Sequence, residues 1–292
     1  MKLIITSMSI NASDVVKLRS QTGAGMMDCK NALEEAGGDM EKAADLLRKK
    51  GIVKAAKRAD KVAAEGMIIS YVNSDEKVGA IVEVNCETDF VSGSDDFKNF
   101  CKEVANVVVD TNPADVAALA NVTLSSGQTL SETVNNLTLK IGEKISVRRF
   151  VRFESEAGKV FSYLHGTRIG VLLEMGGNAD KELGTDVAMH IAASNPKYVK
   201  REEVDPTEIN REKDIYVDQL KQQGKPENII ENIVKGKLDK FYGEICLLEQ
   251  PFIKNEETKV GKLVESKGAT VNRFVRLELG LGIEKQEKDF AS

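Results

Sequence analysis

The most informative pattern of apolar and polar residues lies at residues 78–96, where an apolar run that predicts a strand is followed by a polar run that predicts a loop. Residues 78–84 are apolar enough for a half-buried strand, and residues 92–96 have the Ser, Gly and Asp composition of a turn. Asp89 and Phe90 lie between them. An aromatic side chain at this position either fills the core of its own domain or contacts another molecule, and the pattern alone leaves both alternatives open.

The same strand pattern occurs twice in the chain. Residues 78–84 recur 91 positions later as 169–175, and the alternating strand 147–154 recurs 124 positions later as 271–278. This repetition predicts a duplicated strand-turn-strand-helix unit. The larger shift of the second pair indicates that residues have been inserted within the second copy.

The second copy serves as a control for Phe90. Where the first copy has residues 85–91, the second has Gly-Gly-Asn-Ala-Asp-Lys at residues 176–181, without an aromatic residue. The repeated unit therefore folds without a Phe at this place, which favours a contact role for Phe90 over a core role.

Residues 13–50 have the pattern of three short helices. Ser13 is the expected cap of the first helix, glycines interrupt the pattern after residues 22 and 36, and Asp39 caps a third helix that ends at Lys50. The three helices share an apolar face of Leu18, Met27, Ala32, Leu33, Ala36, Ala43, Leu46 and Leu47. The pattern resembles ubiquitin-associated domains, a family of small binding modules, and this likeness concerns fold alone.

Two more helices are predicted within the second copy. Asp205-Pro206 and Lys225-Pro226 each place Pro at the first position of a helix, and Gly224 separates the two helices. Apolar residues at helical spacing indicate an antiparallel hairpin: Ile209, Tyr216, Leu220, Ile229, Ile230, Ile233, Val234, Leu238 and Phe241. Such a hairpin has too few turns to fold alone, so packing between its helices or against a partner must hold it.

Together these patterns predict an α+β fold with an N-terminal three-helix module, duplicated α+β core subdomains with antiparallel sheets, and an inserted antiparallel helical hairpin. The length of 292 residues exceeds what one compact core usually organises, which supports several modules. The expected domains are a three-helix partner-binding module with its linker (1–60), core subdomain one (61–154), core subdomain two (155–204 and 243–280), the hairpin (205–242) and a short C-terminal module (281–292).

Composition narrows the classes of function. A net charge of −5, the absence of Trp and an aromatic content of 5% argue against a general nucleic-acid binder. The Lys- and Arg-rich stretch 49–61 is predicted to be a solvated linker helix, and its attraction to an acidic partner surface stays open. The sequence contains no apolar run near the ~20 residues of a membrane span, and its start, at either Met1 or Met8, lacks the apolar core of a signal peptide. We expect a cytoplasmic protein that binds neither membranes nor nucleic acid directly.

The sequence predicts no chemical active site. It lacks the G-x-x-x-x-G-K-[ST] phosphate-loop signature, and Gly23-Ala24-Gly25 has neither the preceding strand nor the third glycine of a dinucleotide site. His165 and His190 lack the acidic neighbours of a catalytic triad, so each is interpreted as a core or surface histidine. Four cysteines lie far apart and indicate neither a disulfide framework nor a zinc site: Cys29, Cys86, Cys101 and Cys246. We therefore expect no metal and no cofactor.

Two adjacent methionines indicate a docking surface. Met26 and Met27 differ in direction by ~100° on a helix, so they cannot both face one core. One of them is expected to be exposed beside Arg19, where a flexible methionine adapts easily to a partner. The alternative, that both fill a loose three-helix core, stays open.

Three motifs in combination resemble the bacterial elongation factor Ts family. They are residues 22–33, Thr88-Asp89-Phe90-Val91 and residues 165–171, and the resemblance extends over about residues 13–290. It implies a guanine-nucleotide exchange factor that binds elongation factor Tu, both GDP-bound and nucleotide-free, and that has no chemistry of its own. In the family the helical hairpin is a coiled-coil or dimerisation element, so the resemblance leaves homodimer formation among its roles.

The resemblance also implies roles for particular residues. Phe90 is expected to insert between helices of the partner's GTP-binding domain. Asp89 is expected to interact with the groups that organise the partner's magnesium ion. Thr88 and Val91 are expected to hold this tip in shape. The remaining partner-binding residues implied are Arg19, Met26, Met27, Lys30 and His165. Many family members continue into a longer C-terminal helix that touches the partner, and that contact is expected to be shortened or missing here.

Two other function classes are alternatives. Residues 13–50 could serve an adaptor that binds a ubiquitin fold or a peptide, an idea supported only by the three-helix pattern. An enzyme with an unrecognised site is the third class, and the sequence offers no residues on which to base it.

Overall fold

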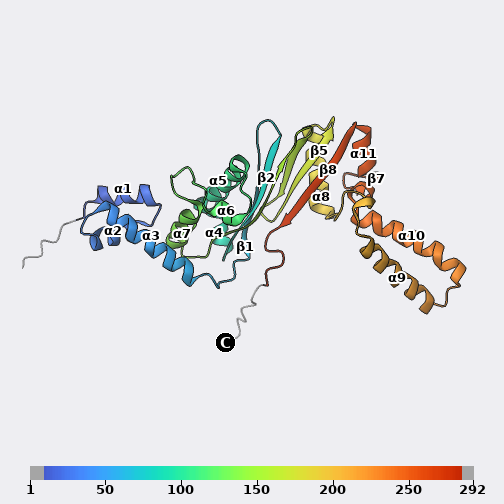
Figure 1. Cartoon of the computed structure of the whole chain (residues 1–292), viewed down its shortest axis with the longest axis horizontal. Helices are drawn as coiled ribbons and strands as arrows, with labels where there is room; N and C mark the ends of the chain where they lie inside the picture. The colour runs from blue at the N-terminus through green and yellow to red at the C-terminus, as the bar shows by residue number, and fades with distance from the viewer. Residues whose placement is uncertain (1–9, 285–292) are drawn as a thin grey trace, which may run out of the picture. The chain divides into compact units, whose positions relative to one another are not determined.

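The computed structural model describes residues 10–284, which form helices and antiparallel sheets, drawn in Figure 1. The expected α+β class is confirmed. Two expectations from the sequence concern residues outside this range: the choice between Met1 and Met8, and most of the C-terminal module 281–292.

The described part of the chain forms two compact units. The first comprises residues 10–71, 80–152 and 278–284, and the second comprises residues 72–79 and 153–277. A sheet of strand order β1-β2-β3 lies mainly in the first unit, and a sheet of order β4-β5-β8 lies in the second. This division is coarser than the domain boundaries expected from the sequence, which stay predictions.

The first unit begins with three helices: α1 (Ala12–Thr22), α2 (Met26–Glu35) and α3 (Met40–Lys57). Asp39 caps α3 as expected, because its side chain accepts hydrogen bonds from the first backbone N–H groups of that helix. The helices pack around a shared core of Val15, Leu18, Ala24, Cys29, Ala32, Leu33, Ala43 and Leu47, joined by Leu139.

The predicted start of α1 is wrong by two residues. Asn11, not Ser13, is the capping residue, since it has extended backbone angles and its side chain accepts the Ser13 N–H at 3.1 Å. Both residue types are good caps, so the sequence alone does not separate them.

The predicted end of α3 is also wrong, because the helix continues past Lys50 to Lys57. Gly51 packs against α7 (Leu130–Ile141), and a Cβ atom there would lie 3.2 Å from the carbonyl oxygen of Asn135. The missing side chain allows the two helices to approach closely. Their packing then outweighs the low helix propensity of glycine.

The first sheet consists of β1 (Glu65–Val72), β2 (Val78–Cys86) and β3 (Ser146–Glu154). β2 contains the predicted strand 78–84 and is buried along nearly its whole length. Between β2 and β3 the chain forms α4 (Asp89–Ser92), α5 (Asp95–Thr111), α6 (Val116–Ala120) and α7. One face of α5 is buried, with Phe97, Phe100, Cys101, Val104, Ala105, Val108 and Val109.

The second unit repeats this plan with β4 (Lys159–His165), β5 (Ile169–Gly177) and β8 (Ala269–Glu278). Helix α8 (Lys181–Ser194) packs against β4 and β5. Gly184 permits this contact, because a Cβ atom there would lie 2.3 Å from the ring of Phe161. The shorter elements of this unit are η1 (Arg201–Glu203), η2 (Leu247–Glu249), β6 (Pro251–Phe252), β7 (Asn255–Lys259) and α11 (Val260–Ser266).

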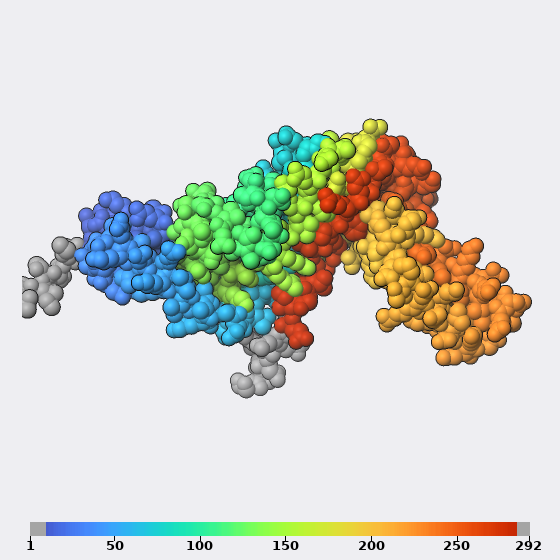
Figure 2. Space-filling model, viewed as in Figure 1, coloured from blue at the N-terminus to red at the C-terminus, as the bar shows by residue number. Residues whose placement is uncertain are grey.

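The predicted hairpin is formed by α9 (Pro206–Gln222) and α10 (Glu227–Ile245), which lie side by side in Figures 1 and 2. Asp205 caps α9 and Pro206 begins it, as predicted, whereas Pro226 is the cap of α10 and not its first residue. The helices share a small apolar core of Leu220, Ile230 and Val234, with Tyr216, Val217, Ile233 and Leu238 packed against it. An open groove of about 770 Å³ lies along this hairpin.

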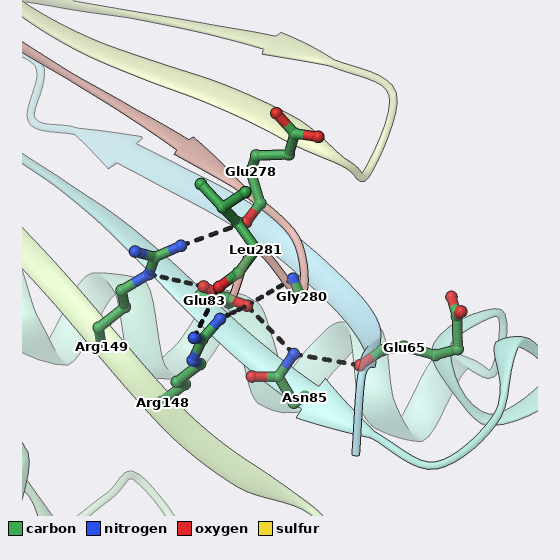
Figure 3. Close-up of polar contacts among 8 residues, drawn as sticks. All are labelled: Glu65, Glu83, Asn85, Arg148, Arg149, Glu278, Gly280 and Leu281. Atoms are coloured by element: carbon green, nitrogen blue, oxygen red, sulfur yellow. Dashed lines mark hydrogen bonds and ion pairs between the residues drawn. The ribbon is translucent and has the colours of Figure 1, made fainter. Parts of the chain in front are cut away.

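The buried carboxylate of Glu83 joins β3 to the chain after β8 in the first unit (Figure 3). Glu83 on β2 accepts from Arg148 Nη1 at 3.0 Å and from Arg149 Nε at 2.6 Å, and it also accepts the backbone N–H of Gly280 at 2.8 Å. Arg148 in turn donates to the carbonyl oxygen of Leu281 at 2.7 Å. Burial raises the pKa of Glu83, but the Gly280 N–H and the two guanidinium groups outweigh burial and hold this pKa below its ordinary value. The cluster fastens residues 280 and 281 to the first sheet.

The second unit has a counterpart of this cluster. Glu174, 91 positions after Glu83, accepts from Arg273 Nε at 2.6 Å and from Asn272 Nδ2 at 3.3 Å. It also accepts from the hydroxyl of Ser155 at 2.8 Å. The internal repeat seen in the sequence therefore extends to the buried polar contacts.

Candidate functional site

A one-turn helix interrupts the connection between β2 and α5. Thr88 precedes α4 in an extended conformation, and its hydroxyl oxygen accepts the N–H of Val91 at 3.4 Å. Val91 is buried, and Asp89 is exposed. The side chain of Phe90 is 87% exposed, so it does not belong to the core of its own unit. The interpretation that Phe90 fills the core of its own domain is therefore wrong, and its role as a contact stays a prediction.

The second unit makes the same connection without such a helix. Its chain passes from β5 to α8 through residues 178–180, and Asp180 caps α8 directly by accepting the N–H of Leu183 at 2.8 Å. In place of an exposed aromatic residue this connection has Ala179, which is buried. The helix that carries Asp89 and Phe90 is therefore an addition to the shared plan and not a requirement of it.

The residues beside α4 are held by ion pairs and backbone contacts. Glu87 accepts two hydrogen bonds from Arg58 Nη1 at 2.7 and 2.8 Å and a third from the backbone N–H of Lys144 at 2.6 Å. Burial raises the pKa of Glu87, but the Lys144 N–H and the Arg58 guanidinium outweigh it and lower this pKa overall. Thr88 donates both its N–H and its hydroxyl to Glu143. Sequence patterns offered no sign of these supports, since they join segments far apart in the chain.

The second group of candidate residues lies where α1 meets α2. Arg19 is exposed in the last turn of α1, Met26 and Met27 are 42% and 65% exposed in the first turn of α2, and Lys30 is exposed one turn later. Lys30 pairs with Glu34 at 3.8 Å. A short glycine-containing loop joins the two turns, so these side chains belong to one end of the module.

The place of Met27 on the common apolar face was wrongly predicted, and so was the alternative in which both methionines fill the core. Met27 lies roughly 200° around the helix from Cys29, which is buried together with Ala32 and Leu33. The helix therefore turns Met27 away from the core, and Met26 extends beyond it at the first residue. The exposed apolar surface is larger than the single methionine expected.

His165 is the exposed last residue of β4, directly before the turn that leads to β5. Its Nδ1 atom lies 3.4 Å from the hydroxyl of Tyr163, and the two rings are stacked with centroids 6.4 Å apart. His165 belongs to the second unit, whereas the other candidate residues belong to the first.

His190 is a buried structural residue. Its Nδ1 accepts the N–H of Ile253 at 3.2 Å, so in the neutral ring Nε2 carries the proton and donates to Gln250 Oε1 at 2.9 Å. Burial lowers the pKa of His190, although the contact with Gln250 partly opposes this shift.

Each of the four cysteines lies where burial raises the pKa of its thiol. All four cysteines are buried, and burial together with the nearby charge of Glu143 raises the pKa of Cys86 to about 12. Between residues 10 and 284, no three His, Cys, Asp or Glu side chains are grouped so that they could hold a metal ion. Over the same range, no helix is both long and apolar enough to cross a membrane.

The chain is similar to known proteins over most of its length. Residues 87–281 match the model of the family described as Elongation factor TS. Over 284 residues the chain is 51% identical to the elongation factor Ts of Methylococcus capsulatus (strain ATCC 33009 / NCIMB 11132 / Bath), with 97% of each chain covered. The first match begins directly before Thr88, and the second extends over nearly the whole chain.

Proposed function

The chain belongs to the elongation factor Ts family, and on this premise we propose that it is a guanine-nucleotide exchange factor for elongation factor Tu. The observation that carries the proposal is the exposed Phe90 on a helix that the second unit lacks. Aromatic side chains are enriched where proteins contact one another, and the repeated unit folds without an aromatic residue at this place. Family membership supports elongation factor Tu as the partner, and the exposure of Phe90 supports α4 as the contact.

The proposed mechanism uses the tip of α4. A GTPase of the phosphate-loop type holds its nucleotide through backbone N–H groups, a lysine and a magnesium ion, so release is slow while these contacts last. Phe90 enters between helices of the GTP-binding domain and shifts the phosphate loop, and Asp89 competes for groups that organise the magnesium ion. Thr88 and Val91 keep the tip folded, one as its cap and the other as its anchor in the core.

The other candidate residues bind the partner without disturbing the nucleotide. Arg19, Met26, Met27 and Lys30 form a surface of two exposed methionines flanked by positive charge, which suits a partly apolar and acidic partner face. We propose that this surface grips the GTP-binding domain and that His165 docks a second partner domain. The helical hairpin serves either as a coiled-coil contact or as a dimerisation element, and the groove along it supports a contact role.

Exchange by this route requires no chemical step. Because binding is reciprocal, the factor weakens nucleotide binding by the same coupling free energy with which the nucleotide weakens binding of the factor. The chain therefore accelerates release of GDP and of GTP alike and has no turnover of its own. The nucleotide that is more abundant in solution sets the direction of exchange.

The test compares variants in the release of a fluorescent GDP analogue from elongation factor Tu. Asp89→Ala and Phe90→Ala are expected to slow the stimulated release strongly. Ile253→Ala serves as the matched control, because Ile253 is an exposed apolar residue, at 45%, in the second unit. Equal release rates for all three variants and the parent chain would refute the role of the tip.

A further inference from the structure

A carboxylate on a neighbouring loop holds the base of the α4 helix. Glu143 directly follows Gly142, the residue that ends α7 with a φ of 90°. Its Oε1 accepts the hydroxyl of Thr88 at 2.7 Å, and its Oε2 accepts the Thr88 backbone N–H at 3.0 Å. The hydroxyl oxygen of Thr88 then accepts the N–H of Val91. One carboxylate thus fixes the cap residue through both of its donors, and the cap residue fixes the helix.

This contact requires two acceptors on the same side chain. Both groups of Thr88 donate, and an ionised carboxylate presents an acceptor oxygen to each of them. Hydrogen bonds to a charged acceptor are also about twice as strong as those between neutral groups. A glutamine at position 143 has the same shape, but its amide offers only one acceptor oxygen and turns a competing donor toward the other group.

The loop that carries Glu143 is itself fastened to the tip. Lys144 donates its N–H to Glu87, so consecutive residues of one loop bind consecutive residues of the other. Glu87 also pairs with Arg58, the residue that directly follows α3 as its C-cap. The base of α4 is therefore connected both to the loop between α7 and β3 and to the C-terminal end of α3.

An external support is needed here for two reasons. A single helical turn is not stable on its own, because forming the first turn fixes several residues for one hydrogen bond. Phe90, at 87% exposure, gains almost nothing from its own fold that would select one orientation. Its direction must be set from the base of the helix, where Thr88 is bound.

We propose that Glu143 is a positioning residue for nucleotide exchange: through Thr88 it orients the first turn of α4 so that Phe90 and Asp89 meet the partner in one geometry. The inference rests on the proposed exchange function. It adds a residue that contacts neither the partner nor the nucleotide. This residue changes the maximal rate of nucleotide release and not the affinity of the chain for its partner.

The test uses Glu143→Gln in the full chain, with Glu132→Gln as the matched control. Glu132 is also a carboxylate that binds a helix-capping threonine, accepting the N–H of Thr129 at 3.0 Å, but it caps α7 and not the tip helix. Release of a fluorescent GDP analogue from elongation factor Tu is measured over a range of chain concentrations. Glu143→Gln is expected to lower the maximal release rate by about tenfold, as for loss of one hydrogen bond to a charged group, and to change the half-saturating concentration by less than about twofold. Glu132→Gln is expected to leave both quantities near those of the parent chain.

A second measurement reports the tip without relying on activity. Amide hydrogen exchange of the peptide covering residues 87–94 is expected to quicken in Glu143→Gln and to stay unchanged in Glu132→Gln. Unchanged release or unchanged protection of this peptide in Glu143→Gln would overturn the inference, and so would an equal loss of rate in the two variants. If the parent chain itself fails to accelerate release, the proposed function is wrong, and the hydrogen-exchange result alone then decides whether Glu143 orders the tip.

Discussion

Replacing Phe90 with Ala separates the stability of the fold from the proposed contact. Because Phe90 is 87% exposed, its own chain covers only about an eighth of an aromatic surface of roughly 200 Å². At ~25 cal/mol per Å², removing the ring costs at most about 0.6 kcal/mol of unfolding free energy. Phe97, in the adjacent helix α5, is fully buried, and its replacement by Ala is expected to cost about 3–5 kcal/mol.

The effect on exchange is expected to be the reverse. A central aromatic anchor in a protein contact contributes about 2 kcal/mol or more, which corresponds to roughly a 30-fold slower stimulated release for Phe90→Ala at subsaturating concentration. Urea unfolding measures the stability of each variant, and release of a fluorescent GDP analogue measures the exchange. A Phe90→Ala variant that loses several kcal/mol of stability, or that still stimulates release fully, would refute the reasoning from exposure.

Three further predictions concern stability. Glu83→Gln leaves Arg148 and Arg149, which are only partly exposed, without their counter-charge. It is expected to lower the free energy of unfolding, measured in urea, by about 3 kcal/mol. A free energy of unfolding equal to that of the parent chain within error would contradict this. The thermal midpoint of the chain is expected to fall as the pH is lowered from about 7 to about 5, because His190 has a pKa below 6.5 in the fold and the unfolded chain binds a proton that the folded chain does not. His190→Gln should flatten this slope, and an unchanged slope would exclude His190 as its source. Gly184→Ala should lower the free energy of unfolding by about 1–3 kcal/mol, because the added Cβ would meet the ring of Phe161. Gly236→Ala, in an open part of α10, should raise it by about 0.5–1 kcal/mol. Equal effects of the two variants in urea unfolding would argue against the close approach of Gly184 to that ring.

The fold could be predicted best where apolar periodicity and repetition agreed. Both copies of the repeated strand appear at the same relative positions, as β2 and β5, and Pro206 begins α9 as its sequence predicted. These features depend on local patterns that a single segment of sequence contains. The exposure of Phe90 could also be anticipated, because the chain supplies a second copy without the aromatic residue.

The errors arose where local patterns compete or where contacts are distant. Asn11 and Ser13 are both good caps, and only the backbone conformation decides between them. Gly51 has the low helix propensity of a helix end, yet it is tolerated within α3 because it lets two helices pack closely. The contact of Glu143 with Thr88 spans 55 residues, and polar contacts of that range follow no periodicity.

The proposed function depends on acceleration of nucleotide release from elongation factor Tu by this chain. The most direct measurement loads the partner with a fluorescent GDP analogue, adds excess unlabelled nucleotide and follows release at rising concentrations of the chain. We expect the release rate to rise with concentration and to reach a plateau, and we expect a fluorescent GTP analogue to behave in the same way. Release at the intrinsic rate at every concentration, with a folded chain and an active partner, would contradict it.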